Sequence, residues 1–238
     1  MASSHSHHSQ DIMPVDKLNP LWNSLTQEER IYLRENAVLQ TYRKNHLIYF
    51  SGDTPKYLVC MISGLAKIYK DEVGMSRPQI VRLAKAGDIF AYRAFLAKKA
   101  HYQNSAVALE TSQAYLVPVK VFEQILQSNN RLAMALIQSL AEKLGHADSH
   151  LATLTQKRMR GRMAQTIISL EDNYGLDAGT NNLHVKLSRI DLAYLSNMTP
   201  SNAIRTLSDF VSEKLISVNR RTIQILNEEK LRIVARIE

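Results

Sequence analysis

A short polar segment near the C-terminus combines side chains that proteins use to recognise DNA bases. Thr199 and Pro200 signal the start of a helix, because a threonine hydroxyl can cap the first turn and proline suits the first helical position. Ser201, Asn202 and Arg205 then share one face of that helix. Arginine can bond guanine, asparagine can bond adenine, and serine suits either base. This face predicts base readout in a major groove, with contact between Arg205 and only phosphate or water as the alternative.

A shorter helix and a tight turn must position this face. The first helix is predicted over 190–195, where the small Ala193 allows another helix to cross close by. Asn197 lies in the turn and tolerates the left-handed backbone that such turns need. The pair forms a helix-turn-helix, whose second helix places its N-terminal turns against base edges. Ser188 and Arg189, at the start of the first helix, complete the predicted DNA contacts of this pair.

Two apolar runs after the second helix, 215–218 and 222–226, flank Asn219, Arg220 and Arg221. This pattern indicates a β-hairpin with a basic tip. Beside a helix-turn-helix such a hairpin is a wing, and its arginines suit phosphates, which position a protein without reading sequence. A solvated turn is the alternative interpretation of the two arginines.

The most regular stretch of the chain is a repeat of apolar residues between 133 and 154, with polar residues on its flanks. Alternating steps of four and three residues are typical of a coiled-coil seam. A narrow apolar stripe on a long helix favours an identical partner and a two-fold dimer, with burial in a larger core as the alternative. The predicted dimer interface consists of Ala133, Ile137, Leu140, Leu144, Ala147, Leu151 and Leu154.

The remaining elements divide between strands and helices. Residues 41–118 contain short apolar and β-branched runs separated by glycine turns, which predicts an antiparallel sandwich or barrel able to enclose a small ligand. Helices are predicted over 20–38, where Thr26 to Glu29 fits a capping box, and over 158–172. We therefore predict an α+β chain with a tail at 1–16, a sensor domain at 17–128, a dimerisation helix at 129–157 and a DNA-binding domain at 158–238.

Composition sets the class of protein. Hydrophobic residues make up 45% of the chain and charged residues 22%, as in a packed protein, and no apolar run reaches the length of a membrane-spanning helix. The single cysteine, Cys60, excludes an internal disulfide, a CxxC pair and a cysteine-held iron–sulfur cluster, and favours the cytoplasm. The net charge of +8 favours a polyanionic partner. The surplus of positive charge is divided evenly between residues 1–154 and 155–238. Residues 157–162 form a local basic run, which either contacts a partner or is a helix end exposed to solvent.

Two features bear on metal binding and catalysis. His5, His7 and His8 in the tail could bind a metal adventitiously. A metal enzyme built on a β-barrel would need clustered ligands on facing strands, but the strand region holds only His46 and His101, far apart in sequence. We therefore predict no catalytic site and no metal site, and no enzyme activity.

The order of strand domain, long helix and winged helix-turn-helix resembles the Crp/Fnr family of bacterial transcription regulators, over about residues 20–230. The matching motifs lie at 69–74, 86–90, 161–166 and 213–217. The resemblance implies an N-terminal antiparallel β-roll of the cyclic-nucleotide-binding jelly-roll type. It also implies a homodimer on a two-fold symmetric DNA operator, RNA polymerase as a partner and no role for a membrane.

The resemblance also places an effector pocket against the long helix, and its residues depart from the cyclic-AMP pattern. Ala91 and Tyr92 stand where such members carry Gly-Glu, and Asn104 stands where they carry the arginine that holds the cyclic phosphate. We therefore expect an effector other than cyclic AMP, whose identity the sequence leaves unknown. The predicted pocket consists of Tyr92, Arg93, Asn104, Ser105, Leu144, Ala147 and Asp148.

Other departures define the remaining possibilities. Arg93 could supply a cation to an anionic effector. His101 could be a haem ligand, although a surface histidine is the simpler interpretation. The degraded pocket also suggests the alternative of an effector-independent regulator whose β-roll is vestigial or contacts a protein. In the recognition helix, Pro200 and Ser201 replace the Arg-Glu of the Crp type while Arg205 is kept, so the operator should differ from the Crp operator.

Overall fold

The computed structural model describes residues 19–71 and 77–238, so the predicted tail at 1–16 and the glycine turn at 73–74 lie outside the described residues. Contacts divide the chain into two compact units. The first comprises Met1–Ile68 and Leu83–Leu140, and the second comprises Tyr69–Arg82 and Ala141–Glu238. The division falls inside the long helix α4, and the sequence-based boundaries at 128 and 157 stay predictions.

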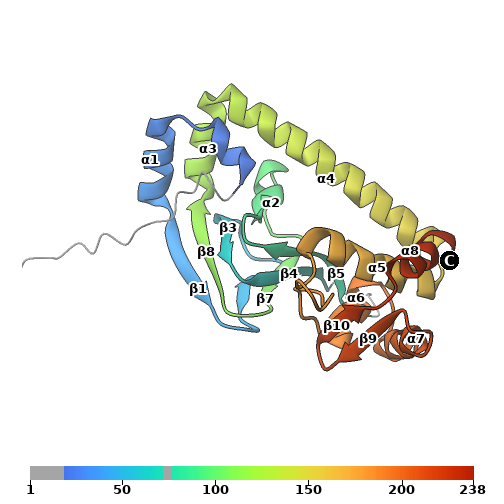
Figure 1. The fold of residues 1–238 in the computed structure, drawn as a ribbon. Coiled ribbons are helices and arrows are strands. Elements are labelled where there is room, and N and C mark those ends of the chain that lie inside the picture. The colour runs from blue at the N-terminus through green and yellow to red at the C-terminus, as the bar shows by residue number, and fades with distance from the viewer. Residues whose placement is uncertain (1–18, 72–76) are drawn as a thin grey trace, which may run out of the picture. The chain divides into compact units, whose positions relative to one another are not determined.

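Two four-stranded sheets form the β-roll, as the glycine-punctuated runs predict (Figure 1). One has the order β1-β8-β3-β6 and the other β2-β7-β4-β5, and the paired strands β1/β8, β3/β8, β3/β6 and β2/β7 are antiparallel. The strands are β1 (Val38–Tyr42), β2 (Leu47–Tyr49), β3 (Tyr57–Ser63), β4 (Leu65–Lys70), β5 (Gln79–Lys85), β6 (Ile89–Phe90), β7 (Ser105–Ala108) and β8 (Ser112–Pro118).

The turn between β3 and β4 depends on Gly64. Its φ of +81° lies in the left-handed region that favours glycine, and a Cβ there would lie 2.7 Å from the Thr111 carbonyl oxygen. The Ser112 hydroxyl, which donates to the Glu110 carbonyl at 2.9 Å, occupies the same space. The two sheets therefore meet here with no room for a side chain.

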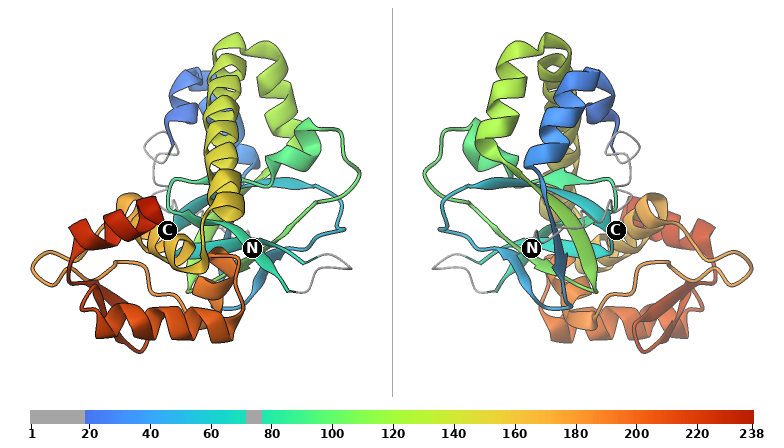
Figure 2. Two further views of the ribbon diagram at one scale, coloured as in Figure 1. Left: turned by 90° about the vertical axis from the view of Figure 1, so that its right-hand side faces the viewer. Right: turned by 90° about the vertical axis from the view of Figure 1, so that its left-hand side faces the viewer.

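The helices of the first unit differ from the prediction at the N-terminus. The expected single helix over 20–38 is two elements, because Thr26 starts α1 with a complete capping box after the 3-10 turn Pro20–Ser24 has ended. Tyr32 of α1 donates to Gln124 of α3 at 2.8 Å, and the two helices lie side by side (Figure 2). The helices are α1 (Gln27–Asn36), α2 (Tyr92–Leu96), α3 (Val119–Ser128) and the start of α4 (Asn130–Gln156).

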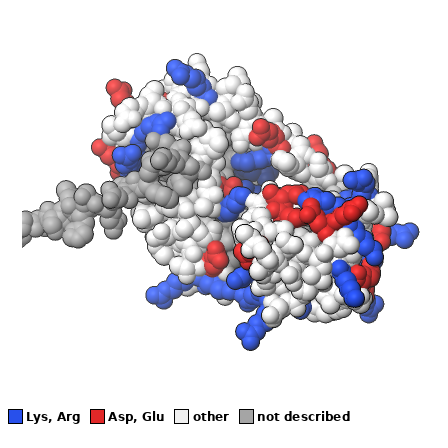
Figure 3. All heavy atoms as spheres, viewed as in Figure 1, with Lys and Arg blue, Asp and Glu red and all other residues white. Residues whose placement is uncertain are grey.

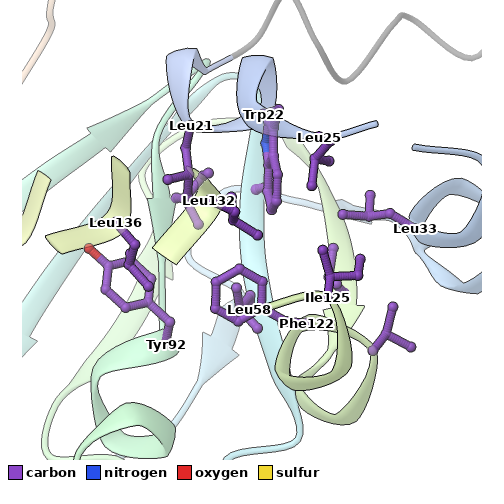
Figure 4. Packing of buried hydrophobic residues seen from close by; sticks show 14 of the residues in the cluster. Leu21, Trp22, Leu25, Leu33, Leu58, Tyr92, Phe122, Ile125, Leu132 and Leu136 are labelled. Atoms are coloured by element: carbon purple, nitrogen blue, oxygen red, sulfur yellow. The ribbon is translucent and has the colours of Figure 1, made fainter. Parts of the chain in front are cut away.

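A hydrophobic cluster joins these helices to the first sheet (Figure 4). Trp22 and Phe122 are fully buried and meet edge to face, with ring centroids 6.3 Å apart. Cys60 is buried in the same cluster, and burial raises the pKa of its thiol to about 12. The lone thiol is therefore a packing residue of the core.

The second unit contains the predicted helix-turn-helix and wing. Its first helix, α5, runs from Met159 to Tyr174, and Gly175 with φ of +78° follows it, close to the predicted stop. Gly161 of α5 is buried against the backbone of Glu238, so α8 packs on this helix without a side chain between them. The other elements are α6 (Arg189–Leu195), α7 (Pro200–Ser212), β9 (Ile216–Asn219), β10 (Thr222–Ile225) and α8 (Glu228–Ile237).

Candidate nucleic-acid interface and effector site

The N-terminus of α7 presents the predicted base-reading side chains to solvent. The backbone N–H of Asn202 donates to the Thr199 hydroxyl at 3.3 Å, and Pro200 occupies the first turn. Ser201 and Arg205 are exposed and Asn202 is half-buried. The opposite face of α7 packs into the unit through Ala203, Thr206, Leu207 and Phe210. This helix can therefore approach a ligand without losing its own packing.

The helix before it and the turn are fixed by local bonds. The Ser188 hydroxyl accepts from the backbone N–H of Asp191 at 3.0 Å and donates to the Asp191 carboxylate at 2.6 Å. Ala193 is fully buried, and Asn197 adopts the left-handed backbone with φ of 50°. Ser188 is a predicted DNA contact, but in this structure its hydroxyl caps α6.

The wing is a two-stranded antiparallel hairpin whose tip carries Arg220 and Arg221. Both side chains are exposed, and Arg220 has a φ of 54°. Arg189 donates from Nη1 to the Arg220 carbonyl oxygen at 2.9 Å, so it braces the wing tip against the start of α6. Sequence reasoning placed Arg189 at the interface but did not anticipate this bracing.

Two arginines of the basic run at 157–162 are bonded within the unit, whereas Arg158 is exposed as in a solvated helix end. Arg160 forms ion pairs with Glu213 at 2.8 Å and Glu238 at 2.9 Å, and its guanidinium lies 5.0 Å from the Phe210 ring centroid. Arg162 donates to the Ser196 carbonyl oxygen at 3.2 Å. These bonds tie α5 to the helix-turn-helix. No local pattern in the sequence reveals partners so distant along the chain.

A shallow groove of about 350 Å³ runs between α7 and the wing. Ile204 and Val211 of α7 line it with Val218 of β9 and Arg189 of α6. Ile204 is 47% exposed and Val211 is 42% exposed, which is high for large apolar side chains. The apolar spacing along α7 predicts that Val211 packs into the unit with Ala203, Leu207 and Phe210, and its exposure corrects that expectation. Sequence reasoning also missed Ile204, which lies outside these packed positions.

The β-roll residues predicted to bind an effector are largely engaged within the chain. Asn104 accepts from the Tyr49 hydroxyl at 2.7 Å, and Ser105 is buried with its Oγ accepting from the backbone N–H of Ser51 at 3.0 Å. The Tyr49 ring lies 4.3 Å from the Tyr102 ring between centroids. Burial raises the pKa of Tyr102, which donates its hydroxyl to a backbone carbonyl. Polar and aromatic groups therefore satisfy one another inside the roll.

The other predicted pocket residues have different surroundings. Tyr92 is only 3% exposed, and its ring lies beside Leu136 in the hydrophobic cluster (Figure 4). Arg93 and His101 are exposed. Leu144, Ala147 and Asp148 belong to the second unit and are exposed there, so the pocket as a whole stays a prediction.

The predicted seam on α4 is largely uncovered in the single chain. Ile137, Leu144 and Leu151 are 57%, 63% and 60% exposed. Ala147 is also exposed, whereas Ala133, Leu140 and Leu154 are half-buried. Only Leu132 and Leu136 of this helix are buried, and they lie outside the predicted seam. The described residues therefore leave Ile137, Leu144, Ala147 and Leu151 outside any larger core.

Comparison with known families identifies both parts. Residues 39–129 match the cyclic nucleotide-binding domain, and residues 161–234 match the Crp-like helix-turn-helix domain, in the order that the fold shows. The chain belongs to the Crp/Fnr family. This Crp/Fnr protein is a DNA-binding transcription regulator with a cyclic-nucleotide-binding-like domain.

Relatives of this regulator cover most of its length. It is 24% identical to the global nitrogen regulator of Nostoc over 79% of this chain and 85% of the relative. It is 25% identical to electron transport regulator A of Shewanella oneidensis over 90% of this chain and 83% of the relative. The structure of FixK2 from Bradyrhizobium japonicum has the same fold, with a TM-score of 0.73, 22% identity and coverage of 83% and 96%.

Two further observations concern the described residues. None of their helices is long and apolar enough to cross a membrane. No group of three or more His, Cys, Asp or Glu among them is placed to hold a metal ion.

On the face drawn in Figure 3, Lys and Arg side chains are interspersed with Asp and Glu. Neither sign of charge covers this face alone.

Proposed function

We propose that this regulator is a homodimer that reads a two-fold symmetric operator with α7 and responds to a small effector other than cyclic AMP. The observation that carries the proposal is the capped, exposed N-terminus of α7 beside a basic wing. Arg205 reads a base, most simply a guanine, because it is exposed on the second turn of the recognition helix. Arg220 and Arg221 contact phosphates and set the register of the protein on the duplex.

The uncovered seam supports the homodimer. A helix that leaves Ile137, Leu144 and Leu151 more than half exposed is best covered by the same helix of a second copy. Two recognition helices then meet successive major grooves on one side of the duplex, which requires a symmetric operator. RNA polymerase is the proposed protein partner, and the cytoplasm is the proposed compartment.

The β-roll supports an effector other than cyclic AMP. Asn104 and Ser105 bond to Tyr49 and Ser51 and supply no cation for a cyclic phosphate. An effector that binds here must replace these internal bonds, and it shifts DNA affinity only by its preference for one of two states. The same closed interior supports the alternative of a β-roll that binds no effector at all.

DNA binding by the full-length protein tests the proposal. A duplex selected from a random-sequence library is titrated by fluorescence anisotropy over a salt series. We expect Arg205→Ala to cost about 1–3 kcal/mol on the selected duplex, and to lose discrimination at one base position in each half-site. Arg220→Ala should weaken selected and random duplexes equally and reduce the salt slope by about one. Equal losses for both variants on both duplexes would exclude base readout by Arg205, and no binding at low salt would overturn the function.

The homodimer and the effector need separate measurements. Sedimentation of the wild type should give a dimer, and Leu144→Glu should give monomers, whereas Gln138→Glu on the flank of the same helix should not. A monomeric wild type would contradict the seam. DNA affinity that is equal for purified protein and for protein supplemented with a small-molecule extract would favour the effector-independent alternative.

A further inference from the structure

Ile204 occupies an unusual place on the recognition helix. It lies between Ala203, which is fully buried, and Arg205, which is exposed, and its own side chain is 47% exposed. One turn before it is Ser201 and one turn after it is Ser208, both exposed. Ile204 is thus an exposed apolar side chain at the border between the packed face and the polar face that the proposed function turns toward DNA.

The packed face of α7 does not include Ile204. The packed face of α7 consists of Ala203, Thr206, Leu207 and Phe210. Ile204 instead lines the open groove against the wing, where 47% of it stays exposed, and a β-branched side chain loses freedom in a helix. The packing of α7 into the head therefore rests mainly on other residues, and half of Ile204 remains available to a partner.

The chemistry of the major groove offers a partner for such a side chain. Base edges there present hydrogen-bond donors and acceptors, and the one apolar group is the C5-methyl of thymine. Ile204 lies in the first two turns of α7, which are the turns that reach base edges in helix-turn-helix proteins. Arg205 follows it directly, so both residues lie in the part of α7 that meets base edges.

We propose that Ile204 reads a thymine in each half-site through contact with its C5-methyl group. This inference rests on the proposed DNA readout by α7 and adds a specificity residue to it. The contact desolvates both apolar groups when the helix enters the groove, and no hydrogen bond is required. A cytosine at that position lacks the methyl, and a purine presents polar atoms there.

Val211 provides a matched control on the same helix. It is also apolar, lines the same groove and is 42% exposed. However, it lies in the last turn of α7, far from the end that meets base edges. A general effect of apolar surface would appear at both positions, whereas methyl readout should appear only at Ile204.

The test removes the methyl group from the DNA and the side chain from the protein. The full-length protein selects duplexes from a random-sequence library, and each thymine of the consensus is then replaced in turn by deoxyuridine. For the wild type we expect one deoxyuridine position in each half-site to weaken binding about three- to fivefold, as expected for one buried methyl group. Ile204→Ala should bind thymine and deoxyuridine duplexes equally, Ile204→Val should keep part of the discrimination, and Val211→Ala should keep all of it.

Two results would overturn the inference while leaving DNA binding intact. One is a consensus whose thymines can all be replaced by deoxyuridine without loss. The other is a deoxyuridine penalty of the same size in Ile204→Ala. Thermal unfolding of each variant confirms that the head is folded, so a loss of discrimination reports on the contact. A protein that binds no duplex at low salt would instead overturn the proposed function itself.

Discussion

The interior of the β-roll and the head formed by α6, α7 and the wing use polar residues in opposite ways. In the roll, Tyr49, Asn104 and Ser105 form buried or partly buried hydrogen bonds with groups of the same chain. In the head, Ser201 and Arg205 are exposed on a helix that other residues cap and anchor. One region satisfies its polar groups internally, and the other leaves them available to a partner.

This difference has consequences for regulation. A ligand of the head loses only water and side-chain freedom on binding, because the supporting backbone is already fixed. A ligand of the roll must also replace internal hydrogen bonds, so it needs a large differential affinity to change the state of the protein. Regulation through the roll therefore depends on how costly its internal bonds are to break.

The largest expected effect is Gly64→Ala, which breaks the closed packing of the roll. The added Cβ meets the Thr111 carbonyl and Ser112, and the left-handed backbone is strained for alanine. We expect a loss of about 3 kcal/mol in unfolding free energy, measured by urea denaturation. Gly52→Ala is the control, because it has a φ of +97° but nothing within 4 Å of the new Cβ. Its loss should be about 1 kcal/mol, and equal losses would assign the effect to backbone strain alone.

Tyr49→Phe measures the internal bonding of the roll directly. It leaves the Asn104 side chain without the hydroxyl that donates to it at 2.7 Å, at nearly unchanged volume. We expect a loss of about 1–2 kcal/mol in unfolding free energy, because one partner of a partly buried bond stays unpaired. Tyr69→Phe on β4 is the control for tyrosine hydroxyl removal. A neutral result for Tyr49→Phe would show that the interior is less closed than its contacts indicate.

Thr199→Ala tests whether the capped backbone of α7 is needed to present its exposed polar side chains to DNA. Loss of the bond from the Asn202 N–H should cost about 1 kcal/mol in unfolding free energy and weaken binding to the selected duplex. Ser201→Ala leaves this cap intact and should affect DNA binding but not stability. Loss of stability in Ser201→Ala of the same size would contradict the division of roles between cap and interface.

The smallest effect concerns Glu213, which anchors α7 to α5. The Arg160 guanidinium lowers the pKa of the Glu213 carboxyl below its ordinary value, so the carboxylate is the stabilising form. Because the pKa is lowered in the folded state, the stabilisation is present above about pH 5 and is lost as pH falls below about 4. We expect Glu213→Gln to cost about 0.5 kcal/mol at pH 7, since the pair is partly exposed.

The difference between Glu213→Gln and wild type should disappear in urea denaturation at low pH. A difference that is constant over this pH range would show that the ion pair does not stabilise the head. High salt should also reduce the difference, because a partly exposed pair is screened.

Local signals predicted the elements and much of the interface. The capping residues Thr26, Ser188 and Thr199, the left-handed Asn197 and the glycine turns act within a few residues, so the sequence displays them directly. The break at Leu25 inside the expected first helix was missed, although Thr26 was recognised as a cap.

Long-range partners could not be predicted. The bond of Arg160 to Glu213 joins residues 53 positions apart, and the bond of Arg189 to the Arg220 carbonyl spans 31 positions. The pairing of Tyr49 with Asn104 likewise depends on how two strands of the roll are placed. No spacing rule connects such positions, so only the fold shows which charged and polar residues anchor the chain and which stay free for a partner.

The burial of Cys60 has a practical consequence for probing the protein. The thiolate is the form that reacts with maleimides and disulfide reagents, and a thiol with a pKa of about 12 inside the core presents almost none of it. A cysteine introduced on the surface, for example at Ser201 of the recognition helix or Gln138 of α4, would therefore take a fluorophore or spin label selectively in the native protein. Cys60 therefore does not have to be replaced before other positions are labelled for site-specific spectroscopy.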